Sequence, residues 1–482
     1  MRTAHELLAG ATPSAGTPSI HLSGAQAEEL TNAAILQDWS QYLSFEPNLY
    51  FRPQDLDELT SFLNGILQGF LKKSHIRIPG SLHSCSDIYR SDAIIDVRAL
   101  PKTLEWNDDN TVVTASANWP LHDFLLEASA RGKSLSATGG TDAQTLAGLI
   151  STNTAPATSQ HTIYELLEWV EYLTIDEASK SVVEKRVSKT DPAFPAIVCS
   201  LGAIGLLTKV QFSLIDEPFF KTIQKVVPLD EVLQDVASTS QKYDFWRIDW
   251  LQETNKGLLW AANRIPRDQA DPNGDYKPDQ SESILKFVFT LLEKLKIGAN
   301  GPLLDDPMRF IYATMAALYG TVEANGPLRN MLPVDRRAPL HVAMAEWSFN
   351  PADLNNVLAR CREYYQQNGW PNLPIEIELT KTDNHFMSPW NWDGLEYIVK
   401  FNFMYLTDIC QTDEEKAGIS THLQGLWEHL MQAGIQFKAH WGKLNFMDYA
   451  FVQAHHKLDQ FTPFIQELFL NPYLSERLRP PA

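Results

Sequence analysis

Cysteine is scarce in this sequence of 482 residues, which contains only Cys85, Cys199, Cys361 and Cys410. These residues show neither the paired spacing of zinc-binding motifs nor the density of a disulfide-stapled secreted domain. We therefore expect reduced thiols in a cytoplasmic protein, and no metal site.

Long apolar runs are absent as well. No stretch approaches the ~20 apolar residues that span a bilayer. Pro, Ser, Gly and His interrupt residues 1–26, where the apolar core of a signal peptide would lie. We expect no membrane insertion.

Positive charge is in short supply. Lys and Arg number 40 against 59 Asp and Glu, so the formal net charge is −19. Nucleic acids and anionic membrane surfaces select for basic patches, so this balance argues against both as partners. Hydrophobic residues at 44% and charged residues at 21% are ordinary globular usage. A chain of this length can bury a large core without disulfides or metals.

Predicted strands and helices are mixed without strict alternation, which indicates an α+β fold rather than a doubly wound parallel sheet. Apolar residues recur every three or four positions from Leu56 to Leu71, which predicts a helix after Pro53. A second helix is expected over Asp123–Ala130, ending at Gly132. The β-rich runs expected to form strands are Ile76–Pro79, Ala93–Val97, Thr111–Ala117, Leu166–Ile175, Leu206–Leu214 and Pro374–Leu379.

Composition divides the chain into four parts. Residues 1–44 are rich in Ala, Ser, Thr and Gly and are expected to be a partly ordered extension, with ordered structure beginning near Tyr50. A first α+β domain is predicted over 45–220 and a second domain over 221–435. A C-terminal segment, 436–482, begins with a dense polar and aromatic motif.

Loops of small residues are candidates for holding a phosphate-rich ligand, because they let backbone N–H groups approach and cradle an anion. The first loop runs from Gly80 to Ser84 and carries His83. The imidazole of His83 suits a nucleophile or a ligand. A turn that happens to contain a histidine is the alternative.

Two further loops have the same character. Gly140, Gln144 and Gly148 lie in a segment rich in glycine and hydroxyl side chains, although ordinary connectors share this composition. Gly202 and Gly205 require close backbone approach before a strand, which structural packing explains equally well.

Taken in order, the three loops resemble the FAD domain of flavoproteins of the vanillyl-alcohol-oxidase type (FAD-binding PCMH-type domain), closest to the aldonolactone and alditol oxidase branch. His440-Trp-Gly-Lys443 resembles the His-Trp-Gly/Ala-Lys motif near the C-terminus of that family. Segments that resemble strands of its substrate domain are Trp246–Asn255, Leu259–Asn263, Met344–Trp347 and Pro374–Glu376. The resemblance covers roughly residues 45–482.

The resemblance implies a two-domain α+β flavoprotein, with an FAD-binding domain covered by a substrate (cap) domain that contains an antiparallel sheet. His83 matches the histidine that bonds covalently to the flavin in some members, and dissociable FAD is the alternative. The residues implied to bind FAD are Gly80, Ser81, Leu82, His83, Ser84, Gly140, Gln144, Gly148, Ser151, Gly202, Gly205 and His440.

Four residues are implied to act in catalysis. Lys443 matches a lysine that stabilises negative charge on the flavin, and Glu376 matches an acidic residue of the substrate pocket. Glu378 and Glu346 are further candidates. A surface ion pair for Lys443, a solvated strand face for Glu376 and domain packing for Glu346 are the alternatives.

Two departures from the family pattern are informative. The pocket strand often reads Glu-x-Arg in the family, whereas this chain has Glu376-Ile377-Glu378. The family's Thr-Gly-Thr-His-Gly is replaced by a segment that ends in Ala155-Pro156. Both changes weaken a sugar-lactone assignment and suit a less polar or cationic substrate. The aromatic residues of the second domain fit that idea, and fit a sheet core at least as well.

The sequence therefore predicts an FAD-dependent oxidase that transfers hydride from a C–H beside an OH or NH group of a small molecule to the flavin. O₂ is the expected electron acceptor, and specialised metabolism is one setting left open. The alternatives are a flavin dehydrogenase with another acceptor, and a non-redox cyclase or binding protein on the same scaffold.

Overall fold

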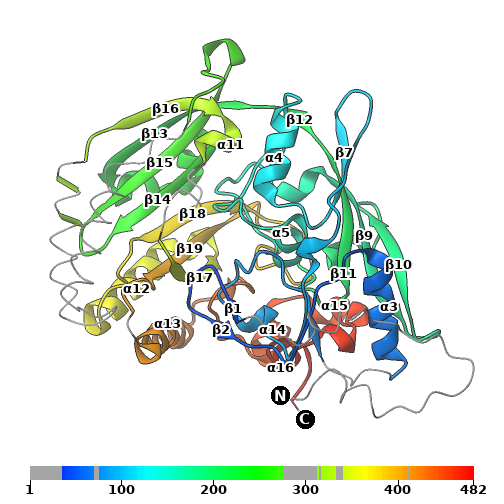
Figure 1. Ribbon diagram of the computed structural model, residues 1–482. Helices are drawn as coiled ribbons and strands as arrows, with labels where there is room; N and C mark the ends of the chain where they lie inside the picture. Colours follow the sequence, from blue (N-terminus) through cyan, green and yellow to red (C-terminus); the bar gives the residue numbers. More distant parts are fainter. Residues whose placement is uncertain are drawn as a thin grey trace, which may run out of the picture.

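Two β-sheet units lie side by side in the computed structural model (Figure 1). It describes residues 35–69, 75–275, 312–313, 316–317, 319–332, 340–410 and 412–481. Helices and strands are mixed throughout, and the predicted α+β class is confirmed. No helix within these ranges is long and apolar enough to cross a bilayer.

The first unit contains a five-stranded antiparallel sheet and a three-stranded parallel sheet. The larger sheet has the order β10 (Ser181–Ser188), β9 (Leu167–Asp176), β11 (Leu206–Ser213), β7 (Val112–Ser116), β6 (Leu104–Trp106). The smaller has the order β3 (Leu49–Phe51), β5 (Ala93–Ile95), β4 (Ile76–Arg77), and β12 (Ile215–Asp216) pairs with β8 (Lys133–Ser134). The helices are α3 (Leu56–Leu67), α4 (Leu121–Ser129), α5 (Leu146–Thr152) and α6 (Phe194–Ile197).

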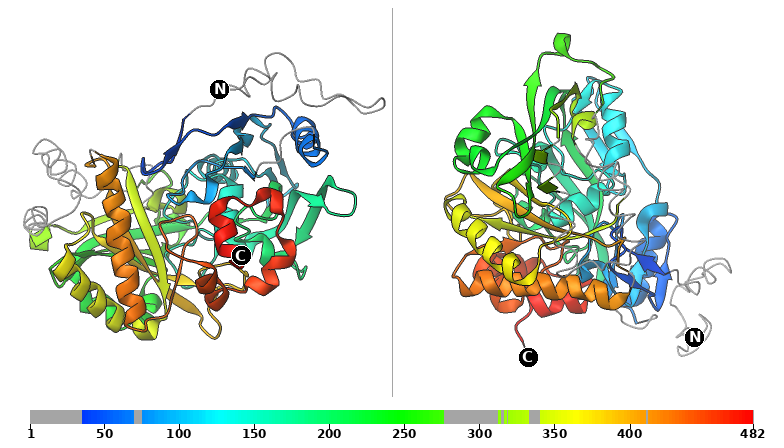
Figure 2. Two further views of the ribbon diagram at one scale, coloured as in Figure 1. Left: turned by 90° about the horizontal axis from the view of Figure 1, so that it is seen from below. Right: turned by 90° about the vertical axis from the view of Figure 1, so that its left-hand side faces the viewer.

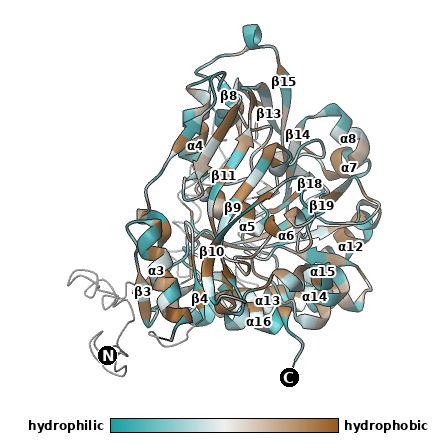
Figure 3. Ribbon diagram, turned by 90° about the vertical axis from the view of Figure 1, so that its right-hand side faces the viewer, coloured by the Kyte–Doolittle hydropathy of each residue, from teal (hydrophilic) through white to brown (hydrophobic). Residues whose placement is uncertain are grey.

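Helix α3 begins where the sequence predicts. The Asp55 side chain accepts a hydrogen bond from the Glu58 N–H at 2.8 Å, which satisfies one of the donors left free at a helix start. The helix has an apolar face and a polar face, visible as brown and teal residues in Figure 3. The last two positions of the predicted helix, Phe70 and Leu71, lie outside the described residues.

The second unit is an eight-stranded sheet in which every adjacent pair is antiparallel, as expected for the cap. Its order is β16 (Val322–Pro327), β13 (Phe219–Pro228), β15 (Lys256–Ile265), β14 (Phe245–Leu251), β18 (Ile375–Lys381), β19 (Tyr397–Leu406), β17 (Val342–Phe349), β20 (Phe437–Ala439). Helices described in full beside it include α7 (Leu229–Leu233), α8 (Val236–Lys242), α11 (Leu328–Met331) and α12 (Leu354–Asn368). Another, α13 (Asp413–Gln432), starts with a capping box of Thr412 and Glu415. The predicted domain boundaries at 220 and 435 stay a prediction.

The two faces of this sheet differ in polarity, because side chains alternate along each strand. One face is apolar and includes Trp347, Phe401 and Phe403, which are fully buried. Helices α12 and α13 cover it (Figure 2). Trp427 of α13 packs edge-on against Trp347, with 5.4 Å between the ring centroids. These aromatic residues therefore belong to the core, and the charged residues lie on the opposite face.

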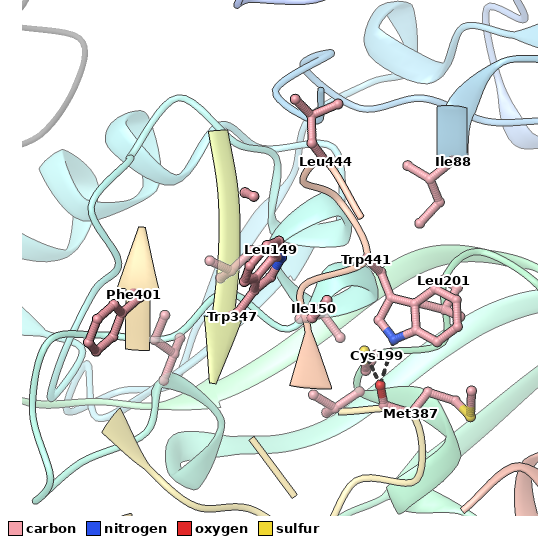
Figure 4. Close-up of a cluster of buried hydrophobic side chains, with 14 of the residues drawn as sticks. Ile88, Leu149, Ile150, Cys199, Leu201, Trp347, Met387, Phe401, Trp441 and Leu444 are labelled. Atoms are coloured by element: carbon pink, nitrogen blue, oxygen red, sulfur yellow. Dashed lines mark hydrogen bonds between the residues drawn. The ribbon is translucent and has the colours of Figure 1, made fainter. Parts of the chain in front are cut away.

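The two units share one hydrophobic core. Figure 4 shows the Trp441 indole N–H and the Cys199 thiol both donating to the Met387 carbonyl, at 2.8 and 3.3 Å. Trp441 follows β20, Cys199 belongs to the first unit, and Met387 lies between β18 and β19. The C-terminal helices α14 (Tyr449–His455), α15 (Leu458–Phe461) and α16 (Pro472–Leu478) pack beside the first unit, where the Asn471 side chain donates to the Asp87 and Arg90 carbonyls.

The described structure begins earlier than predicted. β1 (Leu36–Gln37) pairs with β2 (Ser44–Phe45), although ordered structure was expected from Tyr50. The buried Asp38 side chain holds the intervening turn by accepting from the Leu43 N–H at 2.8 Å. Strands of two residues are too short to show a period, so the sequence pattern could not reveal them.

Gly205 confirms the predicted close backbone approach before a strand. Its φ is +142°, and a Cβ placed on it would lie 2.0 Å from the Leu173 carbonyl oxygen. The packing explanation thus holds for this glycine, which lies at the start of β11.

We expect Gly205→Ala to lower the free energy of unfolding by about 3 kcal/mol or more, because strain at this φ adds to a clash with rigid backbone. Gly132→Ala is the matched control, since Gly132 has φ +69° but nothing within 4 Å of an added Cβ. It should lose only ~1 kcal/mol. Urea unfolding of both variants measures the difference, and equal losses would contradict the clash.

Candidate functional site

A cleft on the first unit brings together the three small-residue loops and the C-terminal motif. It encloses about 1040 Å³ of empty space, its open mouth included. Of the residues predicted to bind the cofactor, those on its wall are Gly80, Ser81, Leu82, His83, Ser84, Gln144, Gly148, Ser151, Gly202, Gly205 and His440. Lys443 also lines it. Gly140 is exposed and is not among the residues that line the cleft, so its role in binding the cofactor stays a prediction.

The Gly80–Ser84 loop presents backbone donors to the cleft. Among the described residues, no acceptor is found for the N–H groups of Gly80, Ser81, Leu82 and Ser84. Leu82 adopts a left-handed conformation with φ +56°, which turns successive N–H groups toward one side. A Cβ on Gly80 would lie 2.5 Å from Thr145 Oγ1, so only glycine fits here without displacement. The loop is therefore a cradle suited to a diphosphate.

Helix α5 forms the neighbouring wall. Its Thr145 side chain accepts from the Gly148 N–H at 3.1 Å and starts the helix. Asn153 ends it in a left-handed conformation with φ +57°. Ala147, Gly148, Ser151 and Thr152 of this short helix all line the cleft.

Arg77 ties the third loop to the rest of the site. Its guanidinium donates to the carbonyls of Leu201, Phe469 and Gly202 at 2.5, 2.7 and 3.2 Å. It is fully enclosed, and burial lowers its pKa to about 10. One buried cation thus holds together β4, the Gly202 loop and the C-terminal segment.

The C-terminal motif lies directly against the His83 loop. The Cys85 N–H donates to the Gly442 carbonyl at 2.9 Å, and the Ser86 hydroxyl donates to the Trp441 carbonyl at 2.7 Å. A Cβ on Gly442 would lie 2.8 Å from Ser84 Oγ, so a glycine is needed for this contact. Burial lowers the pKa of His440 to about 4, which makes its imidazole neutral.

His83 has an aromatic neighbour that sequence reasoning missed. The centroids of the Trp39 and His83 rings are 4.7 Å apart. The backbone N–H of Trp39 donates to the Leu82 carbonyl at 2.8 Å. Trp39 belongs to the turn between β1 and β2. Cys85 faces away from this contact, since its buried thiol donates to the Met344 carbonyl at 3.3 Å.

The residues of the cleft fit FAD. Free backbone donors, glycines that allow close approach and a lysine on the wall suit an anionic dinucleotide with a ring system. No group of three or more His, Cys, Asp or Glu placed to bind a metal occurs within the described ranges.

The predicted pocket carboxylates lie on the polar face of the eight-stranded sheet. Glu376 in β18 has both oxygens engaged, with Asn402 Nδ2 at 2.6 Å and Arg247 Nη1 at 2.6 Å. Asn402 lies directly opposite Glu376 in β19, and Arg247 lies on β14. This network holds the Glu376 side chain in one orientation, so the alternative of a freely solvated strand face does not apply.

Glu378 and Glu346 meet at a lysine that the sequence analysis did not single out. Lys400 Nζ lies 2.6 Å from Glu378 Oε1 and 3.2 Å from Glu346 Oε1. All three residues are buried, and Lys400 is 1% exposed. Lys400 lies directly opposite Glu378 in the β18–β19 register. The only sequence signal was a lysine within the apolar run of β19.

The second departure from the family pattern contacts the same lysine. Lys400 Nζ donates to the Ala155 carbonyl at 3.3 Å, and the Thr380 hydroxyl donates to the Pro156 carbonyl at 2.7 Å. The segment after α5 is thus held by the polar face of the second unit. The two departures belong to one arrangement.

Comparison with known sequences shows that this chain is similar to lactone oxidases. The family model for D-arabinono-1,4-lactone oxidase matches residues 210–476, more than half of the chain. The D-arabinono-1,4-lactone oxidase of Kluyveromyces lactis is 24% identical over 300 residues, which is 61% of this chain and 54% of that protein. The L-gulonolactone oxidase of Bos taurus is 26% identical over 362 residues, which is 73% of this chain and 78% of that protein. The matched region spans about half the length of the first of these relatives.

Comparison with solved structures supports the fold. A solvent-stable cholesterol oxidase has a TM-score of 0.69 at 14% identity, covering 92% of this chain and 97% of that one. A His121Ala variant of the cholesterol oxidase from Brevibacterium sterolicum has a TM-score of 0.67 at 12% identity, covering 93% and 98%.

These matches confirm the predicted aldonolactone oxidase branch and the two-domain fold, and with them FAD as the cofactor. The cleft residues agree with that cofactor. The chain belongs to the D-arabinono-1,4-lactone oxidase family.

Proposed function

We propose that this protein is an FAD-dependent oxidase acting on a small molecule with a C–H beside an OH or NH group. The observation that carries the proposal is the meeting of the cleft with the charged sheet face. The His440 N–H donates to the Glu346 carbonyl at 2.9 Å, so the cleft wall continues into strand β17. Glu346 lies within electrostatic reach of Lys443 on the cleft wall, whereas Glu346, Glu376 and Glu378 do not themselves line the cleft.

Bound FAD supplies the acceptor for a hydride from the substrate carbon. Lys443, on the cleft wall, stabilises negative charge on the flavin. Glu376, fixed by Arg247 and Asn402, accepts a hydrogen bond from a substrate OH or NH and orients the adjacent C–H. The polar sheet face thus positions the substrate, while the loops hold the cofactor.

The substrate is a small molecule whose polar groups match several carboxylates. The relatives' names specify lactones, whereas Glu378 adds a carboxylate to the pocket of this chain. We therefore include amines and amino alcohols beside lactones and polyols among the candidate substrates. O₂ is the proposed electron acceptor, with H₂O₂ as the product.

A covalent bond from His83 to the flavin and a cytoplasmic location complete the proposal. His83 lies on the cleft wall beside the Trp39 ring, whose plane is tilted by 33° from that of the imidazole. All four cysteines are free thiols, which suits a reducing compartment.

The first experiment is an absorption spectrum of the purified protein before and after acid precipitation. Yellow colour that stays with the precipitate supports a covalent flavin, and colour in the supernatant supports a dissociable one. A panel of lactones, polyols and amines is then tested for peroxide formation in air. Flavin bleaching without peroxide would favour a dehydrogenase, and a colourless protein that FAD does not reconstitute would contradict the proposal.

Gly80→Ala should weaken FAD retention at least tenfold. The added Cβ would displace Thr145 or the loop backbone and spoil the cradle of N–H groups. Gly140→Ala serves as the control, because nothing lies within 4 Å of a Cβ there and the residue is outside the cleft. Since a covalent bond would mask affinity, FAD binding is titrated in the His83→Ala background. Equal affinities in the two glycine variants would contradict the cradle.

His83→Ala should release its flavin completely on acid precipitation and slow turnover roughly tenfold or more, because the covalent bond raises the flavin potential and holds the ring in place. His161→Ala is the matched control, since His161 pairs with Glu165 on the surface. Flavin that stays covalently bound in the His83 variant would refute the assignment.

A further inference from the structure

The turn between β1 and β2 contacts the His83 loop on one of its sides. The backbone N–H of Trp39 donates to the Leu82 carbonyl, and the half-buried indole lies against the His83 imidazole with 4.7 Å between the ring centroids. His83 lines the cleft, whereas Trp39 is not among the residues that line it. The indole therefore supports the imidazole from outside the cleft wall.

The other side of the same turn is held by the second unit. The Thr407 hydroxyl, just after β19, donates to the Ser40 carbonyl. Lys416 Nζ, on α13, donates to the Gln41 carbonyl at 2.7 Å. The Gln41 side-chain nitrogen lies 3.0 Å from Nε2 of His341, which precedes β17. Three segments of the second unit thus hold the turn that carries Trp39.

Hydrogen bonds within the turn keep its shape without the indole. The buried Asp38 carboxylate accepts from the Leu43 N–H at 2.8 Å and from the Ser40 hydroxyl. The bond from Trp39 to Leu82 uses backbone atoms only. A substitution of Trp39 therefore removes the ring contact with the imidazole and leaves these hydrogen bonds in place.

We propose that Trp39 is a positioning residue that fixes the orientation of the His83 imidazole for bonding to the flavin. The inference rests on the proposed function, which includes that bond. An imidazole turns about two side-chain bonds, and it reacts only when a ring nitrogen faces the reacting carbon at about 3–3.5 Å. The indole fills space through which the imidazole would otherwise rotate, so it limits the orientations that the imidazole adopts.

Bond formation balances in atoms and electrons with O₂ as the oxidant. An imidazole nitrogen of His83 gives up its proton, a methyl carbon of the flavin ring gives up one proton, and a new N–C bond joins the two atoms. The two electrons released pass through the flavin to O₂, which takes up both protons and leaves as H₂O₂. Trp39 supplies no atom or charge to this step and acts through His83 alone.

The first test compares the rate of bond formation in Trp39→Leu and Trp106→Leu. Each full-length protein is purified from cells limited in riboflavin and incubated with FAD in air, and acid precipitation of timed samples measures the covalent flavin. Trp39→Leu should form the bond roughly tenfold or more slowly than the wild-type protein, because the imidazole is less well oriented. Trp106 is the matched control, since it is half-buried in the same unit, faces Arg131 at 4.3 Å and does not line the cleft.

A second measurement separates positioning from a structural role. Total flavin that stays with the protein on native gel filtration reports FAD binding, and circular dichroism reports folding. Trp39→Leu should bind as much FAD in total as the wild-type protein while its covalent share falls. Trp39→Phe should restore the rate, because it keeps a flat ring beside the imidazole. A loss of total flavin or of folded protein in step with the covalent share would show a structural role and overturn the proposal.

The inference and the proposed function fail in different ways. If Trp39→Leu forms the bond at the wild-type rate, or if Trp106→Leu slows it equally, the role of Trp39 falls and the His83 bond stands. If the wild-type protein releases all its flavin on acid precipitation, the bond and the role of Trp39 fall together. Peroxide formation with the substrate panel then still decides whether the protein is an oxidase.

Discussion

The contact between the C-terminal motif and the His83 loop is the constraint on which the rest of the site depends. Residues some 360 positions apart are joined there by hydrogen bonds from Cys85 N–H and Ser86 Oγ to the Gly442 and Trp441 carbonyls. Because β20 immediately precedes this motif and pairs with β17, the same contact fixes the large sheet against the cofactor cleft. Separating the two units would open both the shared core and the site.

The polar sheet face depends in turn on strand register. Glu378, Arg247 and Lys400 lie on one line across three strands, and Glu376 and Asn402 lie on the next line. A slip of one residue in β19 would turn Lys400 toward α12 and α13 and bring Phe401 toward the cleft. The burial of Trp347, Phe401 and Phe403 on the opposite face therefore specifies the register that assembles the charged cluster.

Much of this arrangement could be predicted from the sequence, and the reasons for the failures are physical. The loops around His83, Gly148 and Gly205 carry local signals, since small residues in fixed order mark close backbone approach, and all three line the cleft. Gly140 does not line the cleft, and a glycine in a loop does not reveal which side of the loop faces a ligand. Lys400 and Trp39 were missed because their importance comes from partners on distant segments, which no local pattern contains.

The two departures from the family pattern look independent in the sequence but form one unit in the structure. A carboxylate at position 378 would be costly to bury alone, and removing one partner of a buried ion pair typically costs about 3–5 kcal/mol. Lys400 offsets that cost, and its remaining hydrogen bond goes to Ala155, in the other altered segment. The pocket therefore retains a cation but moves it from the pocket strand to the neighbouring one. Glu378 and the Ala155-Pro156 segment are therefore tied to each other through Lys400.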